Sequence, residues 1–375
     1  MRFSQIKSAI YDDYLYFEKL KSDMPMKEGM VYLLRDIDLL SGNASQYLKI
    51  GKTEMGVGTP KRIKQHQTGN PRKIYNVFDI QAPGMTEMEL FMQHYFSSLR
   101  ISGEWFDIDD ILLNSEVLPL MNTHFAEQTI TNAHIANVEQ SKAMPDNGVA
   151  RAPSAQEQTW SDELKSAKEA LRVAKAYHSI RDFNLRSLIG TNGGIEGIVT
   201  LIEKTQADYF DKAAFLQTLT PGQLALCQQD ETKFTQKVGW MNKPQSLKNL
   251  DLQLFNDAKE AKDNAPDSTP IANLANAELA RNAAIEAEHR EWLATRRDIK
   301  VQEWIVTQKE MALLDSLGVN REITDVVSWV REDVTTLAKW NIGLAKENFP
   351  NEIAAFTTSK PNHVAVEINE CRGYP

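Results

Sequence analysis

Two short strand-like runs, MVYLLRD at 30–36 and YLKIG at 47–51, constrain the fold of this 375-residue chain more than any other feature. Both runs are rich in residues that favour strands, and the loop between them carries Ser-Gly-Asn, which is typical of a turn. A third run, KIYNVFDIQA, follows at 73–82. We therefore expect a small antiparallel or mixed three-stranded sheet in the first part of the chain.

Two helices are expected to flank this sheet. In the segment TPKRIKQHQ at 59–67, Thr59 can cap a helix and Pro60 suits its first position. A second helix is expected to begin at Thr86 and to pack an apolar stripe on the sheet. The stripe consists of Leu90, Phe91 and Phe96. The predicted first unit is thus an α+β domain covering residues 1–126.

Five polar side chains are placed where this unit would bring them together. Tyr32 and Lys49 lie on neighbouring strands, Arg62 and His66 are four residues apart on one helix face, and Glu89 lies beside the apolar stripe of the second helix. Hydrolysis of a phosphodiester needs an activated water, charge neutralisation on the phosphate and help for the leaving oxygen. These residue types can supply those functions. Taken singly, each is equally consistent with an ordinary surface position.

The charge distribution points the same way. The whole chain carries a net charge of −9, but the segment 49–73 contains seven basic residues and a single acid, Glu54. A local basic segment in an acidic protein favours a groove for phosphates over a general coat for nucleic acid. The alternative is a solvated surface helix.

Several short motifs in this unit occur in a defined order over roughly residues 28–110. Their residues are Gly29-Met30-Val31-Tyr32, Lys49-Ile50-Gly51, Arg62, Glu89 and Gly103-Glu104-Trp105-Phe106. The ordered set resembles the GIY-YIG nuclease superfamily, and most closely its phage-type branch, known as T5orf172. Lys49 stands where the second motif of the superfamily carries tyrosine, as is common in that branch.

The resemblance implies a metal-dependent DNA endonuclease or nickase acting on phage or mobile-element DNA, in homing, interference with a competitor, or restriction. Glu89 would bind Mg²⁺ or Mn²⁺, which fits an ion that keeps several waters. Arg62 would clamp the phosphate, and Lys49 would bind it or lower the pKa of the Tyr32 phenol. Either Tyr32 or His66 would serve as general base. The alternative function is a catalytically silent DNA-binding or protein-interaction protein that retains the fold.

The rest of the chain is expected to be mostly helical. Residues 127–159, rich in Ala, Asn, Gln, Ser and Pro, indicate a linker. A helical domain for DNA targeting or homo-oligomerisation would follow at 160–350, and a tail at 351–375 would contain one strand-like run, HVAVEI. After the helix that begins near Trp160, further helices are expected at the ranges 196–211, 221–236, 271–317 and 321–346.

The second part of the chain carries one weak motif and no convincing repeat. Residues 309–333 resemble a helix-turn-helix slightly, although plain helical packing explains them better. The sequence shows no convincing internal repeat.

The expected location is a reducing cytoplasm. No apolar run approaches the length of a membrane span, and the N-terminus turns acidic too early for a signal peptide. Cys227 and Cys371 lie far apart without a CxxC partner, which is typical of free thiols. We therefore expect no membrane partner. The expected partner is DNA, as the resemblance implies.

Overall fold

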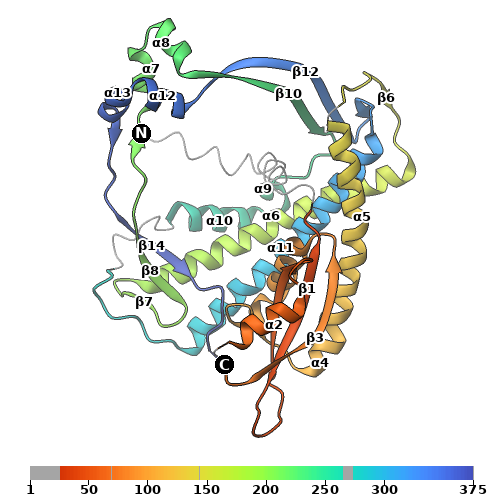
Figure 1. The fold of residues 1–375 in the computed structure, drawn as a ribbon, viewed down its shortest axis with the longest axis vertical. Coiled ribbons are helices and arrows are strands. Elements are labelled where there is room, and N and C mark those ends of the chain that lie inside the picture. The colour runs from red at the N-terminus through yellow and green to blue at the C-terminus, as the bar shows by residue number, and fades with distance from the viewer. Residues whose placement is uncertain (1–25, 69, 143, 265–272, 375) are drawn as a thin grey trace.

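The computed structural model describes residues 26–68, 70–142, 144–264 and 273–374 (Figure 1). Within these ranges the chain is α+β, with long helices and several small, mainly antiparallel sheets. None of the helices in these ranges is both long enough and apolar enough to cross a membrane. Both cysteines are free thiols, as expected. The prediction about a signal peptide concerns residues outside the described ranges.

The N-terminal sheet contains the three predicted strands and two more. β1 (Gly29–Ile37) pairs antiparallel with both β2 (Tyr47–Glu54) and β3 (Lys73–Ala82). The motif at 103–106 contributes to β5 (Trp105–Asp107), which pairs with β2 and continues the sheet to β4 (Arg100–Ser102). The sheet is therefore five-stranded in the order β3-β1-β2-β5-β4, rather than three-stranded.

Helices pack on both faces of this sheet. α3 (Met85–Tyr95) buries Met88 and Met92 in the hydrophobic core that also contains strand residues of β1 and β2. α2 (Thr59–Gln67) lies over the other face, where Ile63 packs against Leu34 and Tyr32. The single turn η1 (Ser97–Leu99) follows α3.

Two details of these helices differ from prediction. Thr59 lies inside α2, after the N-cap residue Gly58, and its buried hydroxyl has no hydrogen-bond partner among the described residues. Leu90 is exposed, and the α3 face that packs on the sheet uses Met88, Phe91 and Met92 instead.

The predicted linker at 127–159 is wrong for its first half. After α4 (Asp110–Leu112) and η2 (Leu113–Val117), the chain forms α5 (Leu118–Lys142), a 25-residue helix. Its buried positions recur every three or four residues, which is the period of a helix that packs along one side. They are Met121, His124, Gln128, Thr131, Ile135, Val138 and Ser141. Four of these seven are polar, so the helical period is not visible as an apolar pattern in the sequence.

Two 35-residue helices form the centre of the second part of the chain. α6 (Ala155–Ile189) begins at a capping box of Ser154 and Glu157, and α11 (Ala283–Leu317) packs along it. The hydrophobic core that starts between the N-terminal sheet and α3 continues through α5 into these two helices. α9 (Leu247–Leu250) and α10 (Leu252–Asn264) pack on α6.

Much of the region predicted as helical consists of strands. The predicted helices at 196–211, 221–236 and 321–346 are replaced wholly or largely by strands, and residues 271–272 of the fourth lie outside the described ranges. Because residues 327–340 form one strand, the helix-turn-helix interpretation is also wrong. The predicted HVAVEI strand is confirmed. The strands are β6 (Ala150–Arg151), β7 (Gly194–Ile195), β8 (Val199–Lys204), β9 (Tyr209–Phe210), β10 (Gln228–Trp240), β11 (Glu322–Ile323), β12 (Val327–Trp340), β13 (Thr357–Thr358) and β14 (His363–Ile368).

The second part of the chain is an internal structural duplication. The ends of α6, the strand β7 and the start of β8 recur 128 residues later (318 − 190) as the ends of α11, the strand β11 and the start of β12. The helix N-caps correspond, Ser154 with Asn282, and so do the C-caps, Gly190 with Gly318. The hairpin turns correspond through Gly197 and Asp325, which both have positive φ. Arg151 and Leu279 also correspond, because each forms a parallel β-bridge to the hairpin of the other copy. The expectation of no repeat is therefore wrong at the level of structure.

The two copies interlock through a pair of two-stranded ribbons. In one ribbon, β8 and β9, which follow α6 in the first copy, pair with β14 and β13 at the end of the second copy. In the other ribbon, β12, which follows α11 in the second copy, pairs with β10 at the end of the first copy. The pairing is equivalent in the two ribbons: Val199 faces Ile368, and Val327 faces Trp240. Val327 and Ile368 lie 128 residues after Val199 and Trp240, respectively.

Both ribbons end in one small helical cluster, which we call the tip (Figure 1). The tip has its own core, in which Phe215, Cys227, Ala345 and Ile353 are buried together. Each copy contributes two short helices to it. These are α7 (Lys212–Thr218), α8 (Pro221–Leu226), α12 (Ile342–Asn348) and α13 (Pro350–Ala355).

The duplication predicts matched effects at its two C-cap glycines. Gly190 (φ 54°, ψ −123°) and Gly318 (φ 56°, ψ −126°) adopt a backbone conformation that other residues enter only with strain. Gly190→Ala and Gly318→Ala should each lower the free energy of unfolding by about 1–3 kcal/mol. Gly222→Ala, in open space at a position without positive φ, is the control and should be nearly neutral. Urea unfolding measures all three, and a neutral effect at only one cap would contradict the equivalence.

Candidate active site

Tyr32 is held over the backbone of the neighbouring strand. It is fully buried and lies opposite Gly51 in the β1–β2 register, and the next pair along the same face is Leu34 and Lys49. A Cβ added at Gly51 would lie 2.7 Å from the Tyr32 hydroxyl. Only glycine therefore fits at position 51, which gives the glycine of the second motif a physical reason.

The helix α2 brings its predicted pair to this tyrosine. The Tyr32 hydroxyl lies 3.2 Å from Nε2 of His66. Arg62, one turn earlier, is close enough for its guanidinium to act on the Tyr32 phenol, and its buried Nε has no hydrogen-bond partner among the described residues. Its Nη1 donates to Gln65 at 2.7 Å.

Burial dominates the protonation of this pair. It raises the pKa of Tyr32, an effect that Arg62 opposes and that nearby Glu104 and Glu89 reinforce. Burial also lowers the pKa of His66, and the charges of Lys49 and Arg62 lower it further. At neutral pH the phenol is therefore protonated and the imidazole is neutral. That combination allows the phenol to donate to a free lone pair on the ring.

Lys49 is buried and forms an ion pair with Glu104 of the Gly-Glu-Trp-Phe motif at 103–106. The Glu104 side chain is 39% exposed, and its charge acts on Tyr32, His66 and Glu89. Glu104 was not among the predicted site residues. The signal that pointed to it was its place in the Gly-Glu-Trp-Phe motif beside strand β5.

Glu89 projects from α3 and is also buried, with its side chain 7% exposed. Its Oε2 lies 2.8 Å from Nζ of Lys52, a second residue that sequence reasoning did not assign to the site. Burial raises the pKa of Glu89, while Lys52 opposes this shift. Next along α3, Gln93 donates to the backbone oxygen of Ile50 at 3.1 Å, which fixes the helix on β2.

In the part of the chain that the structure describes, the oxygen donors at Glu89 suit a hard metal ion with few protein ligands rather than one with many. Among the described residues, no group of three or more His, Cys, Asp or Glu side chains gathers in a way that could hold a metal. Glu89 alone fits Mg²⁺ or Mn²⁺, which bind through one or two carboxylates plus water and phosphate oxygens. It does not fit a structural zinc ion, which takes four protein ligands.

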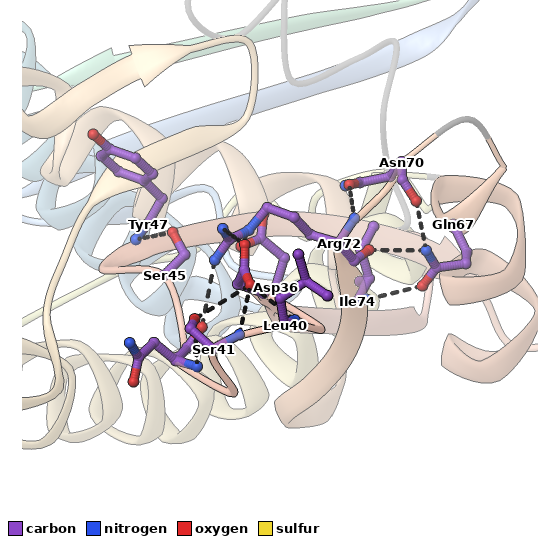
Figure 2. Close-up of polar contacts among 11 residues, drawn as sticks. Asp36, Leu40, Ser41, Ser45, Tyr47, Gln67, Asn70, Arg72 and Ile74 are labelled. Atoms are coloured by element: carbon purple, nitrogen blue, oxygen red, sulfur yellow. Dashed lines mark hydrogen bonds and ion pairs between the residues drawn. The ribbon is translucent and has the colours of Figure 1, made fainter.

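The basic segment at 49–73 is partly neutralised by acids from outside it. Lys49 and Lys52 pair with Glu104 and Glu89 as described, and Arg72 pairs with Asp36 at 2.6 Å (Figure 2). Within the described ranges, the remaining four basic residues make no ion pair. They are Lys61, Arg62, Lys64 and Lys73. The free positive charge is therefore concentrated on α2 and at the start of β3.

Side-chain contacts fix α2 and the β1–β2 hairpin relative to β3 (Figure 2). Gln67, at the end of α2, donates to the backbone oxygens of Asn70 and Arg72, and its own oxygen accepts from the amide of Ile74. Arg72 also reaches Asp38 in the hairpin loop at 3.3 Å. This bracing holds Arg62 and His66 at a defined place above β1.

Comparisons of the chain with protein-family models, curated proteins and solved structures found no match. The site is therefore defined by its geometry alone. Among the five predicted residues, Tyr32 and His66 are in direct contact. The charges of Arg62, Lys49 and Glu89 each act on at least one other member of the set.

Replacing Gly51 tests this packing. Gly51→Ala should destabilise the fold by about 1–3 kcal/mol, because the new methyl group meets the buried Tyr32 ring and hydroxyl. Gly56→Ala adds the same methyl group in open space and should change stability by less than about 0.5 kcal/mol. Thermal unfolding gives both values, and the NMR shifts of the His66 ring report whether Tyr32 has moved. Equal stability of the two variants would show that Tyr32 does not pack on Gly51.

Proposed function

We propose that the chain is a metal-dependent DNA endonuclease or nickase of the GIY-YIG type, with an N-terminal catalytic unit and a duplicated helix-and-ribbon part. The observation that carries the proposal is the 3.2 Å contact between the Tyr32 hydroxyl and Nε2 of His66, one helical turn from Arg62. A buried phenol beside a proton acceptor and a guanidinium is suited to phosphodiester hydrolysis. The order of the sequence motifs supports the same class.

In this mechanism His66 accepts the proton. The attacking water would bind to the Tyr32 oxygen, and the phenol would pass its proton to Nε2 of His66 as it takes one from the water. The lowered pKa of His66 keeps the imidazole neutral, and therefore able to accept, at physiological pH. The raised pKa of Tyr32 argues against a resident phenolate as the base.

The cationic side chains would bind the scissile phosphate. Arg62 presents a planar set of donors whose Nε is free of other partners among the described residues, which matches two phosphate oxygens. Lys49, held by Glu104, would contribute a fixed positive charge next to it. Glu89 would hold Mg²⁺ or Mn²⁺, and that ion would neutralise charge on the phosphate and the leaving oxygen.

The substrate we propose is phage or mobile-element DNA inside the host cytoplasm. The free positive charge on α2 suits a phosphate backbone and carries no sequence information. Target selection, or assembly into a homo-oligomer, would then belong to the duplicated part. That part contains two equivalent sets of helices and ribbons, which would suit a target or partner with two similar halves.

A second candidate function is a catalytically silent DNA-binding protein that keeps the fold. The ion pair between Glu89 and Lys52 favours it, because the only carboxylate assigned to the metal already has a cationic partner. The two functions differ in whether purified protein cuts DNA.

Plasmid cleavage separates these functions. Wild-type protein with Mg²⁺ or Mn²⁺ should nick or linearise supercoiled plasmid, while Arg62→Met and Glu89→Gln should lose at least about 10²-fold in rate. Lys61→Met, which removes the exposed neighbouring charge of α2, is the control and should weaken binding only slightly. Binding without any cutting, across several DNA substrates, would favour the silent protein.

The pH dependence of cleavage tests the proton acceptor. Cleavage requires deprotonated His66, with a pKa lowered from 6.5, and deprotonated Glu89, with a pKa raised from 4.5. Deprotonation of His66 should therefore be complete below its ordinary pKa of 6.5, and the rate should rise on the acid side and level off once Glu89 is also deprotonated. His66→Asn should lower the plateau by about 10²–10⁴-fold. A rate that keeps rising up to pH 9 would instead indicate Tyr32 ionisation.

A further inference from the structure

The ion pair between Lys52 and Glu89 is asymmetric in its exposure. The Glu89 carboxylate is fixed on α3 and nearly buried, while the Lys52 side chain is 32% exposed. The neighbouring pair has the opposite arrangement, because there Lys49 is buried and its partner Glu104 is the exposed member. Of the two lysines on β2, Lys52 is therefore the one whose charged end can move into solvent.

The position of the Lys52 ammonium is also that of a bound cation. Its Nζ lies 2.8 Å from Oε2 of a carboxylate whose side chain is only 7% exposed. A divalent ion approaching Glu89 meets a positive charge already on the carboxylate. Two cations this close repel each other strongly at the low effective dielectric of a buried site.

We propose that Lys52 is a built-in competitor for the divalent cation at Glu89, and that the metal binds only by displacing its ammonium. This inference rests on the proposed function, because it assumes that Glu89 is the metal ligand. The flexible four-carbon stem lets the displaced ammonium turn to solvent or to a nearby phosphate.

This competition couples metal binding to DNA binding. A phosphate backbone at the site offers Lys52 an alternative partner and so frees Glu89 for the cation. By thermodynamic reciprocity, each ligand then raises the affinity for the other. The protein without DNA would hold its metal weakly, and the complete site would form on the substrate.

Binding of Mn²⁺ to the full-length protein tests the inference without a cleavage assay. Free Mn²⁺ is measured by electron paramagnetic resonance at pH 8, where protons compete least for Glu89. Lys52→Met should bind Mn²⁺ on the order of tenfold more tightly than wild type, because a unit positive charge beside the ligand is gone. Lys52→Gln, which keeps a polar group, should act in the same direction. Lys27→Met removes a lysine from an exposed pair with Glu54 and should leave the affinity unchanged.

A second titration measures the coupling. A short duplex with non-hydrolysable phosphorothioate linkages should tighten Mn²⁺ binding to wild type severalfold and have less effect on Lys52→Met. Thermal unfolding of each variant, measured alongside, identifies any loss of fold.

The outcomes separate this inference from the function on which it rests. If Glu89→Gln abolishes Mn²⁺ binding but both Lys52 variants bind as wild type or more weakly, Glu89 is the ligand and the competition is refuted. If Glu89→Gln leaves binding unchanged, or if neither wild type nor Lys52→Met binds Mn²⁺, the metal assignment itself fails and the inference fails with it.

Discussion

The candidate site depends on the register between β1 and β2. This register sets Tyr32 over Gly51, where the absence of a side chain makes room for the buried ring, and places Lys49 on the same face. A shift of one residue would turn the side chains of one strand to the opposite face, so that Tyr32 and Lys49 would no longer share a face. The α2 helix completes the arrangement by bringing His66 to the Tyr32 hydroxyl. The chemistry therefore follows from one strand pairing and one braced helix.

The buried charges of the site are held in ion pairs. Both lysines of β2 have carboxylate partners, Glu104 and Glu89, contributed by elements that pack beside the strand. Burying a lone charge is costly, so paired charges are what a nearly buried site can hold. The same pairing leaves the basic side chains of segment 49–73 that make no ion pair, among the described residues, mainly on α2. Under the proposed function, these side chains would give an acidic protein a compact phosphate-binding surface without a strong general attraction to nucleic acid.

The sequence predicted the parts of the fold that local signals determine. The strands, α2 and the position of Glu89 follow from β-branched runs, turn residues and helical spacing within about 80 residues. The 25-residue α5 was missed because polar residues such as Gln128 and Thr131 occupy buried positions along it. The ribbons were missed because their strands pair with segments that are distant in the chain, which no local pattern specifies. The duplication is carried by caps and turn geometry, such as the positive φ shared by Gly197 and Asp325. It is also visible in one short stretch of sequence, where Gly190, Asn192, Ile195 and Val199 recur as Gly318, Asn320, Ile323 and Val327. Lys52 became visible only through its contact with Glu89, whereas Glu104 already stood in the Gly-Glu-Trp-Phe motif.

A double-variant cycle on Tyr32 and His66 tests the central claim most directly, because it asks whether the two act as one unit. Single-turnover plasmid cleavage is compared for wild type, Tyr32→Phe, His66→Asn and the double variant. If the phenol passes its proton to the imidazole, the double variant should lose about as much rate as the more damaging single variant. Losses that multiply would mean that the two side chains act independently. Absence of cleavage by the wild-type protein would contradict the account altogether.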